Sequence, residues 1–289
     1  MSSHSSKAYK FVVQNGMVTA AYEVEDGTTK LESVDRNETW SVNANLVIKT
    51  KYEDGQREIT VYSDDDGNGI YAKASTRKNT GDNGDLHGND GNDHLHGSSG
   101  DEHIDGGNGI DDVSYQGSRH EYAIKVGTTG VSVDDSNATR DGTDTLSAVE
   151  RLHFNDGSLA LDTDGHAGQA YRLYKAAFDR ESDESGLGYW LNRLDHGATL
   201  ESVANSFIAS AEFKALYGEK IGDDQFVEHL YNNVLDRTPD AGGKSYWLDS
   251  LEHGMTREKV LINFSESAEN QTNVAPLVLT GIPYQEMPA

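Results

Sequence analysis

Three consecutive nine-residue stretches between Gly88 and Ser114 place glycine, asparagine and acidic residues at fixed positions in front of one large apolar residue. They read G-N-D-G-N-D-H-L-H, G-S-S-G-D-E-H-I-D and G-G-N-G-I-D-D-V-S, and a degenerate copy precedes them at 79–87. The apolar residues fall nine apart, at Leu86, Leu95, Ile104 and Val113. Because carboxylate and carbonyl oxygens are the ligands of hard cations, this spacing indicates a calcium-binding turn that is repeated along a parallel β-helix.

Each repeat is expected to form a tight turn of six residues and a three-residue strand whose middle residue points inward. Glycine in the turn permits positive φ and a close approach of the backbone to an ion. Turn n stacks on turn n+2, so the turn at 88 lies on the turn at 106, with Ca²⁺ held between Asp93 and Asp111. The predicted ligand residues of this site are Gly88, Asp90, Gly91, Asp93, Gly106, Asn108, Gly109 and Asp111.

A second pair of turns, at 79 and 97, offers Asp85 and Glu102 as carboxylate ligands. The first repeat is out of phase there, and the third carries Glu in place of Asp. We therefore expect about one or two calcium ions in the block. The alternative, a flexible Gly/Asp-rich linker, is disfavoured by the fixed spacing of the apolar residues.

The repeats at 88–114 resemble those of the RTX (repeats-in-toxin) family of Gram-negative bacteria. The segment Asp141–Gly157 is similar to the one that closes such blocks, where it extends the roll and covers its open end. The resemblance implies export by a type I secretion apparatus through an uncleaved C-terminal signal, and folding on Ca²⁺ outside the cell. It implies a secreted protein that is extracellular or associated with the cell surface.

The composition excludes several classes of partner and site. Lys and Arg number 24 and Asp and Glu 49, and the net charge of −25 repels nucleic acid and anionic membrane. No apolar run is long enough to be a transmembrane segment, and residues 1–16 lack the apolar core of a cleavable signal peptide. Cysteine is absent, which excludes disulfides and thiolate metal sites. The hydrophobic fraction of 35% favours several small domains.

Residues 9–76 are predicted to form an antiparallel β-meander of five to seven strands, after a disordered tail at 1–8. N-G and D-G dipeptides separate the β-branched and aromatic runs there and are strong hairpin signals. In the same domain Asp64, Asp66 and Asn68 follow the first half of a calcium loop, D-x-D-x-N-G, although its twelfth position is not Glu. A weak calcium site and a solvated acidic turn fit this motif equally well.

Residues 79–161 are predicted to hold the short parallel β-roll and its capping strands, at 113–115, 122–126 and 131–133. Four acidic residues of the cap either add ligands or are solvated in loops, and we favour solvation. They are Asp134, Asp135, Asp141 and Asp144.

From 162 to 272 the apolar residues recur at the spacing of an α-helix, and the sequence repeats itself at an offset of 57 residues. Each copy is predicted to contain three helices. The predicted N-caps are Asp183, Thr199, Asp240 and Thr256. The repeated pattern D-R-x-x-D-x-x-G…Y-W-L…L-x-x-G…F-x-x-S-x-E resembles a family of unknown function with a phycobilisome-linker-like helical fold, often found beside RTX blocks. That resemblance implies no catalytic role.

The repeated pairs Tyr189-Trp190 and Tyr246-Trp247 either stack on carbohydrate or belong to the helical core, and helical spacing beside Leu favours the core. Residues 273–289 are interpreted as a C-terminal tail. Its prolines predict that no helix persists there, and it is either a secretion signal or a segment packed on the helices.

His94 and His96 flank the inward Leu95 and are expected to point outward on one strand. Two histidines at that spacing can chelate Zn²⁺, Ni²⁺ or haem iron, although most exposed histidines bind nothing.

We find no catalytic constellation and expect no enzyme. The sequence predicts a multidomain α+β protein with an antiparallel meander, a Ca²⁺ β-roll with capping strands and a duplicated all-α domain. Its predicted function is calcium-dependent extracellular binding, in adhesion or a biofilm matrix, with a cell-surface or matrix polysaccharide or a surface receptor as partner. The alternatives are a haem- or transition-metal-capturing protein, and a carbohydrate-active enzyme whose catalytic domain is N-terminal.

Overall fold

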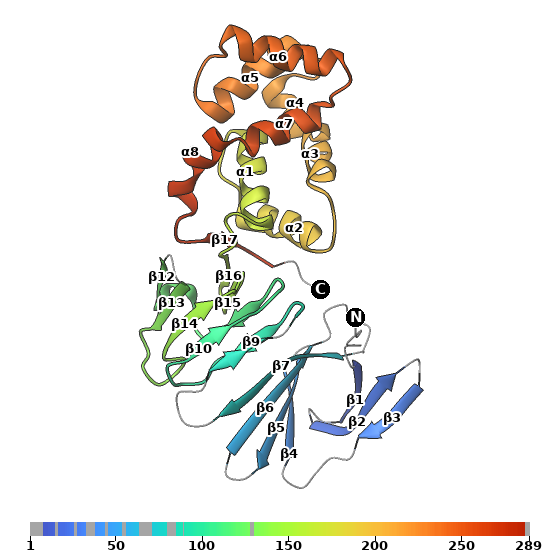
Figure 1. Cartoon of the computed structure of the whole chain (residues 1–289), viewed down its shortest axis with the longest axis vertical. Helices are drawn as coiled ribbons and strands as arrows, with labels where there is room; N and C mark the ends of the chain where they lie inside the picture. The colour runs from blue at the N-terminus through green and yellow to red at the C-terminus, as the bar shows by residue number, and fades with distance from the viewer. Residues whose placement is uncertain are drawn as a thin grey trace. The chain divides into compact units, whose positions relative to one another are not determined.

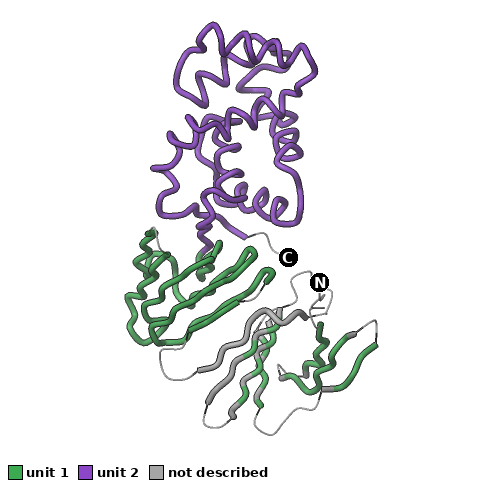
Figure 2. Tube along the Cα trace, viewed as in Figure 1, with its two compact units in different colours: residues 1–156, 289 green, residues 157–288 purple. Residues whose placement is uncertain are grey.

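The computed structural model describes residues 8–14, 17–25, 28–32, 38–43, 46–53, 56–63, 71–79, 85–88, 90–127 and 130–286. The chain divides into two compact units, Met1–Asp156 with Ala289, and Gly157–Pro288 (Figure 2). In its described part the first unit is built of strands with one short 3₁₀ helix, Arg119–Glu121, whereas α1 to α8 all belong to the second (Figure 1). The predicted α+β class is confirmed. No helix among the described residues is long and apolar enough to cross a membrane.

The N-terminal sheet contains seven antiparallel strands in the order β3-β2-β1-β7-β6-β5-β4. β1 pairs with both β2 and β7, so two meander arms meet at β1 instead of following one another across the sheet. Tyr9, Val47 and Tyr62 are buried at its centre, and the rings of Tyr9 and Tyr62 meet edge to face at 4.8 Å. The strands are Ala8–Gln14, Met17–Glu25, Thr28–Glu32, Glu38–Asn43, Leu46–Glu53, Gln56–Ser63 and Tyr71–Asn79.

The glycine-rich repeats form the predicted roll of short parallel strands. β8 (Leu86–His87) pairs with β10 (His103–Asp105), and β9 (His94–His96) pairs with β11 (Asp112–Ser114). The alternate-turn register is thereby confirmed, because each strand pairs with the strand two repeats away. The four inward residues at nine-residue spacing are buried, as the repeat requires: Leu86, Leu95, Ile104 and Val113.

The cap continues both sheets of the roll. β14 (Thr143–Ser147) lies parallel to β10, and β15 (Arg151–Phe154) lies parallel to β11. The antiparallel strands β12 (Tyr122–Gly127) and β13 (Gly130–Asp135) complete a five-stranded sheet of order β12-β13-β14-β10-β8. The cap strands put Leu146 and Leu152 in register with Ile104 and Val113. The roll is therefore one round longer than its recognisable repeats.

The helical unit contains the predicted duplication, but each copy has four helices instead of three. The first copy comprises α1 (His166–Phe178), α2 (Glu184–Asp195), α3 (Leu200–Ala209) and α4 (Ala211–Tyr217). Every helix of the second copy begins 57 residues later: α5 (Asp223–Leu235), α6 (Ala241–Glu252), α7 (Arg257–Ser265) and α8 (Ala268–Val278).

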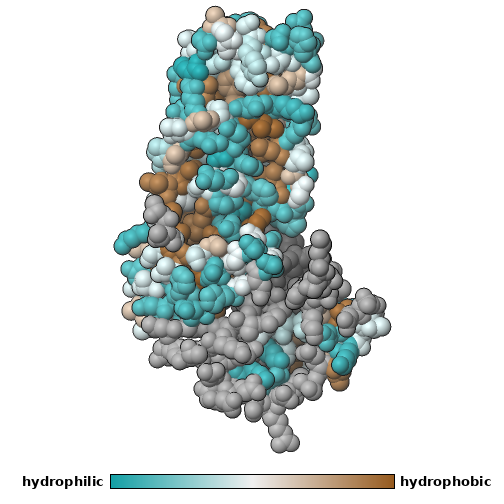
Figure 3. All heavy atoms as spheres, in the orientation of Figure 1, coloured by the Kyte–Doolittle hydropathy of each residue, from teal (hydrophilic) through white to brown (hydrophobic). Residues whose placement is uncertain are grey.

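The extra helix of each copy begins at a serine that the helical period alone does not reveal. Ser210 and Ser267 take an extended backbone conformation, and each side chain accepts a hydrogen bond from an amide in the first turn of the following helix. The predicted caps Asp183, Asp240, Thr199 and Thr256 act in the same way. The exposed face in Figure 3 is mainly hydrophilic over these helices, with smaller hydrophobic areas between.

The repeated motifs of the helical unit hold its own loops together. Arg180 forms two hydrogen bonds to Glu212 and lies over the ring of Tyr174, and Arg237, 57 residues later, does the same with Glu269 and Tyr231.

The aromatic pairs divide between the core and the surface. The Trp190 ring meets Phe207 at 5.0 Å and the Trp247 ring meets Phe264 at 5.2 Å, so both indoles pack on the core as predicted. Their neighbours Tyr189 and Tyr246 are exposed.

The C-terminal segment is more ordered than its prolines suggest. α8 runs to Val278 with Pro276 in its last turn, which corrects our expectation that no helix persists in residues 273–289. Pro276 has no N–H to donate to the Thr272 carbonyl, and the helix ends two residues after it. β17 (Ile282–Tyr284) then pairs antiparallel with β16 (Gly157–Ala160), and Ile282 and Tyr284 are buried.

This returning segment covers one copy of the repeat and not the other. The Gln285 amide donates to the Glu184 carbonyl, and a Cβ on Gly188 would lie 1.7 Å from the Gln285 carbonyl oxygen. In the second copy Ser245 stands where Gly188 is, and no residue of α6 is buried. The close approach of the segment thus depends on a glycine that the second copy lacks.

Candidate metal centres of the roll

Three carboxylates form a column along the sheet that contains β9, β11 and β15. The Asp93 amide donates to Oδ1 of Asp111 at 2.8 Å, and the Asp111 amide donates to Oε2 of Glu150 at 2.9 Å. Each acid stands two residues before an inward apolar residue, the sixth position of its repeat. Asp93 and Asp111, which the sequence predicts as partners, are therefore brought together and buried.

Glycine is required beside these carboxylates because there is no room for a side chain. A Cβ on Gly88 would lie 2.7 Å from Oδ2 of Asp93, and a Cβ on Gly106 would lie 2.7 Å from Oδ2 of Asp111. Gly91 and Gly109 have φ of 107° and 154°, which residues with a Cβ rarely adopt. Gly88 and Gly106 thus leave space for the carboxylates, and Gly91 and Gly109 allow the backbone conformation of the turns.

The third-position residues Asp90 and Asn108 lie at the exposed rim of the same pair of turns. They form a parallel bridge, and the Asn108 side-chain amide donates to Oδ1 of Asp90 at 2.9 Å. The Gly91 amide donates to the Asn108 carbonyl. These contacts fix how the turn at 88 stacks on the turn at 106.

A second column runs along the other sheet and joins a repeat to the cap. The Glu102 amide donates to Oδ1 of Asp144 at 3.1 Å, and the Thr143 amide donates to Oδ1 of Asp101 at 2.8 Å. Glu102 also accepts from the Ser98 amide at 2.9 Å. The partner that the structure gives Glu102 is therefore Asp144 of the cap.

Asp85 does not lie beside Glu102. Leu86 pairs with Ile104, which places Asp85 in register with His103, and Asp85 is exposed. Asp85 is offset by one residue from Glu102 because Asp85 is the seventh residue of its repeat and Glu102 is the sixth residue of its own.

Asp111 and Asp144 are the two most unusual groups of the roll. Both are fully buried, and Oδ2 of each makes no hydrogen bond to a described residue. Burial raises the pKa of each to about 7. The neighbouring charges of Asp93 and Glu150 add to this at Asp111, and that of Glu102 at Asp144. An unsatisfied buried oxygen is costly, and a cation would satisfy both oxygens while restoring the ionised form.

Two of the three remaining cap acids correct the expectation that they are solvated in loops. Asp135 and Asp141 are buried, and Asp134 is exposed. The Arg140 guanidinium donates to both oxygens of Asp135 at 2.6 and 2.9 Å, and hydrogen bonds from Arg140 and two amides lower the pKa of Asp135 despite its burial. Asp141 accepts from the Tyr122 hydroxyl at 2.5 Å. These two acids are satisfied within the chain.

The histidines of β9 have separate partners. His94 pairs with Asp112, while Nδ1 of His96 lies 2.9 Å from the Ser114 carbonyl oxygen. His153, on β15, lies 3.4 Å from the other oxygen of Asp112. Although Asp112 is buried, these two imidazoles lower its pKa. In the part of the chain that the structure describes, no group of three or more His, Asp or Glu side chains is arranged to hold a metal ion by side chains alone, so each calcium site would also need backbone carbonyl ligands from the turns.

Asp64, Asp66 and Asn68 lie outside the described residues, so that motif stays a prediction.

Two members of the columns, Asp144 and Glu150, lie beyond the recognisable repeats. A signal for them exists in the sequence, because every acid of the columns precedes an inward apolar residue by two positions. The five pairs are Asp93/Leu95, Glu102/Ile104, Asp111/Val113, Asp144/Leu146 and Glu150/Leu152. The glycines of the cap are too few to show the nine-residue pattern.

Comparisons with known proteins cover parts of the chain. Residues 204–274 match the family model described as "Domain of unknown function (DUF4214)". Among solved structures, the crystal structure of the extracellular lipase LipA from Serratia marcescens is similar over 25% of this chain, at 21% identity and a TM-score of 0.16. The matched part spans 13% of that lipase, and at such a TM-score we draw nothing from it. No curated protein matches the chain.

Proposed function

We propose that the chain is a secreted calcium-binding protein of the RTX type, whose roll folds on Ca²⁺ and whose role is extracellular binding. The observation that carries this is the pair of buried acids, Asp111 and Asp144, which lie beside other carboxylates and to whose Oδ2 atoms the described residues give no hydrogen bond of normal geometry. The neighbour of Asp144 other than Glu102 is the Tyr115 hydroxyl, which lowers the pKa of Asp144 less than burial raises it. One ion lies between the turns that carry Asp93 and Asp111, and a second between those that carry Glu102 and Asp144. Carboxylates and turn carbonyls supply the oxygen ligands that Ca²⁺ prefers.

Type I export fits the electrostatics of the repeats. Residues 79–118 contain no Lys or Arg, so their carboxylates repel one another when no cation is present. Such a segment stays unfolded where free Ca²⁺ is scarce and folds where it is abundant. The proposed surroundings are therefore the cell exterior, with a cell-surface or matrix polysaccharide or a surface receptor as partner.

A non-enzymatic role is part of the proposal. The buried acids of the described roll are assigned to the proposed calcium columns, to the Arg140 and Tyr122 contacts of the cap and, for Asp112, to pairs with His94 and His153. In the helical unit, the residues of the repeated motif cap helices and pair with one another.

Calorimetric titration of EDTA-stripped protein with Ca²⁺ tests the proposal. We expect uptake of about two ions in the wild type, loss of one by Asp111→Asn and loss of the other by Asp144→Asn. Asp134→Asn serves as the matched control, because Asp134 is an exposed acid of the same cap. Unchanged uptake in both Asp111→Asn and Asp144→Asn would contradict the proposed sites.

A further inference from the structure

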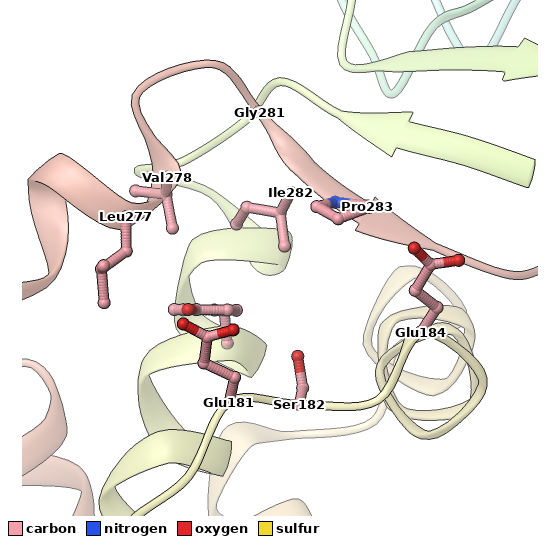
Figure 4. Close-up of a pocket in the computed structure, with 9 residues that line it drawn as sticks. Glu181, Ser182, Glu184, Leu277, Val278, Gly281, Ile282 and Pro283 are labelled. Carbon is pink, nitrogen blue, oxygen red and sulfur yellow. The ribbon is translucent and has the colours of Figure 1, made fainter. Parts of the chain in front are cut away.

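A cavity of about 270 Å³ lies in the helical unit, between the α1–α2 connection and the returning C-terminal segment (Figure 4). An apolar cavity of about 150 Å³ is already enough for benzene, so this one has room for an aromatic ring with a short side chain. All its lining residues belong to residues 171–283 of one unit. The proposed calcium columns lie in the other unit, so the cavity is a separate site.

The two sides of the cavity differ in chemistry. Val278, Ile282 and Pro283 form an apolar side, and Figure 4 shows Glu181 and Ser182 on the side opposite Val278 and Ile282. Glu184, at the start of α2, completes the acidic side. Neither Glu181 nor Glu184 forms an ion pair with any residue that the structure describes, although Glu184 accepts from the Gln285 side-chain amide at 3.3 Å.

Tyr171 of α1 gives an independent indication that a polar ligand group belongs here. Its side chain lines the cavity and is 93% buried, since 7% of the residue is exposed. Its hydroxyl makes no hydrogen bond to a described residue. Burial and the charge of Glu181 raise the pKa of Tyr171, so the phenol stays neutral. The hydroxyl is not among the fully enclosed polar atoms, so it is open to the cavity, where a ligand donor would take the place of water.

We propose that this cavity binds a small organic ammonium compound with an apolar body. The apolar part lies against Val278 and Ile282, and the ammonium group lies towards Glu181 and Glu184 and donates to the Tyr171 hydroxyl oxygen. The net charge of −25 favours the approach of a cation. Glu181 and Glu184 are exposed at the mouth of the cavity, where their charges favour a cation over an anion.

The duplication supplies a natural comparison for this site. Thr238 and Ala241 of the second copy occupy the positions of Glu181 and Glu184. The returning segment, which forms the apolar side, covers α2 and not α6. The site is therefore expected once in the chain, in the first copy.

Titration with phenethylammonium, followed by NMR of the full chain in Ca²⁺, tests this. We expect saturable shifts at Tyr171 and Ile282, and binding at least about tenfold weaker in Glu181→Gln, the loss of about 1.4 kcal/mol. The uncharged analogue 2-phenylethanol should bind to the wild type at least as weakly as phenethylammonium binds to Glu181→Gln. Glu219→Gln removes an exposed acid elsewhere in the unit and should leave the affinity unchanged.

Three results would each overturn the proposal. They are no saturable shift with phenethylammonium, equal affinity for the alcohol and the ammonium compound, and equal weakening by Glu181→Gln and Glu219→Gln. Because the titration is done with Ca²⁺ present and reads the helical unit, its failure would not count against the calcium columns.

Discussion

Buried or half-buried acids occur in both the roll and the helical unit, and they have different neighbours. Asp111 of the roll lies beside Asp93, Asp112 and Glu150, and Asp144 lies beside Glu102; Oδ2 of each acid makes no hydrogen bond of normal geometry to a described residue. Glu266 of the helical unit accepts two hydrogen bonds from Arg172, at 2.6 and 2.9 Å, and Arg172 also donates to the Thr163 carbonyl. Arg172 thus neutralises the half-buried charge of Glu266, whereas a cation is proposed to neutralise the buried acids of the roll.

The cap of the first unit also contains a buried acid that the chain itself neutralises. Arg140 neutralises Asp135 there by two hydrogen bonds, a short distance along the chain from Asp144. An arginine could therefore have served the columns as well, but residues 79–118 contain none. The proposed calcium sites would give the roll an external ion in this role, whereas Asp135 and the acids of the helical unit are neutralised by the chain.

The largest effect expected from this comparison is on thermal unfolding with and without Ca²⁺. Ca²⁺ at about a hundred times its dissociation constant stabilises the roll by about 2.7 kcal/mol per site, and two sites raise its Tm by about 20 °C. The unfolding temperature of the helical unit should be the same in EDTA and in Ca²⁺. Differential scanning calorimetry in EDTA and in Ca²⁺ measures both, and a common shift of the two transitions would contradict the comparison.

The pH dependence of the calcium-free roll should be opposite in sign to ordinary acid denaturation. Because the pKa of Asp111 and of Asp144 is raised to about 7 in the folded state, folding is favoured while they are protonated. That stability is present below the unfolded pKa of about 4 and is lost as pH rises to about 7, by up to about 4 kcal/mol per group. Far-UV circular dichroism in EDTA should therefore show β structure of the roll that is present at pH 5 and is lost as pH rises to 8.

Saturating Ca²⁺ should remove that trend, because bound carboxylates are ionised throughout. The double variant Asp111→Asn/Asp144→Asn should flatten it in EDTA. A calcium-free roll that becomes more stable as pH rises from 5 to 8 would be the opposite result.

Breaking the ion pair of the helical unit should destabilise that unit alone. Arg172→Met leaves the charge of Glu266 in a half-buried position and should cost about 3 kcal/mol of unfolding free energy. Arg180→Met breaks the exposed pair with Glu212 and is the matched control, with an expected cost of about 1 kcal/mol or less. Urea unfolding followed at 222 nm measures both, and calcium uptake should not change in either variant.

A smaller effect is expected where the returning segment meets α2. Gly188→Ser places a Cβ against the Gln285 carbonyl and should cost about 2 kcal/mol, with faster amide exchange at Ile282 and Tyr284. The equivalent change in the second copy, Ser245→Gly, leaves no contact with the segment to disturb. Equal effects of the two variants on amide exchange in β17 would show that the segment does not depend on Gly188.

The sequence predicts the regular parts of this molecule and misses the parts that tertiary contacts decide. The nine-residue spacing predicts the strand pairing of Leu86 with Ile104, and the 57-residue offset predicts both helical copies. It does not reveal that Asp144 is Glu102's partner, because that contact joins a repeat to a cap segment 42 residues away. Nor does it reveal the fourth helix of each copy, which depends on one serine cap, Ser210 or Ser267.

Amide hydrogen exchange, measured residue by residue in EDTA and in Ca²⁺, tests the external-ion account most directly. The Asp93 and Asp111 amides donate to carboxylates of the first column, and the Glu102 amide donates to the second. We predict that these three amides exchange freely in EDTA and become protected in Ca²⁺, while the amides of α1 and α5 are protected in both. Equal protection of the three amides in EDTA and in Ca²⁺ would contradict the claim that the roll needs an ion.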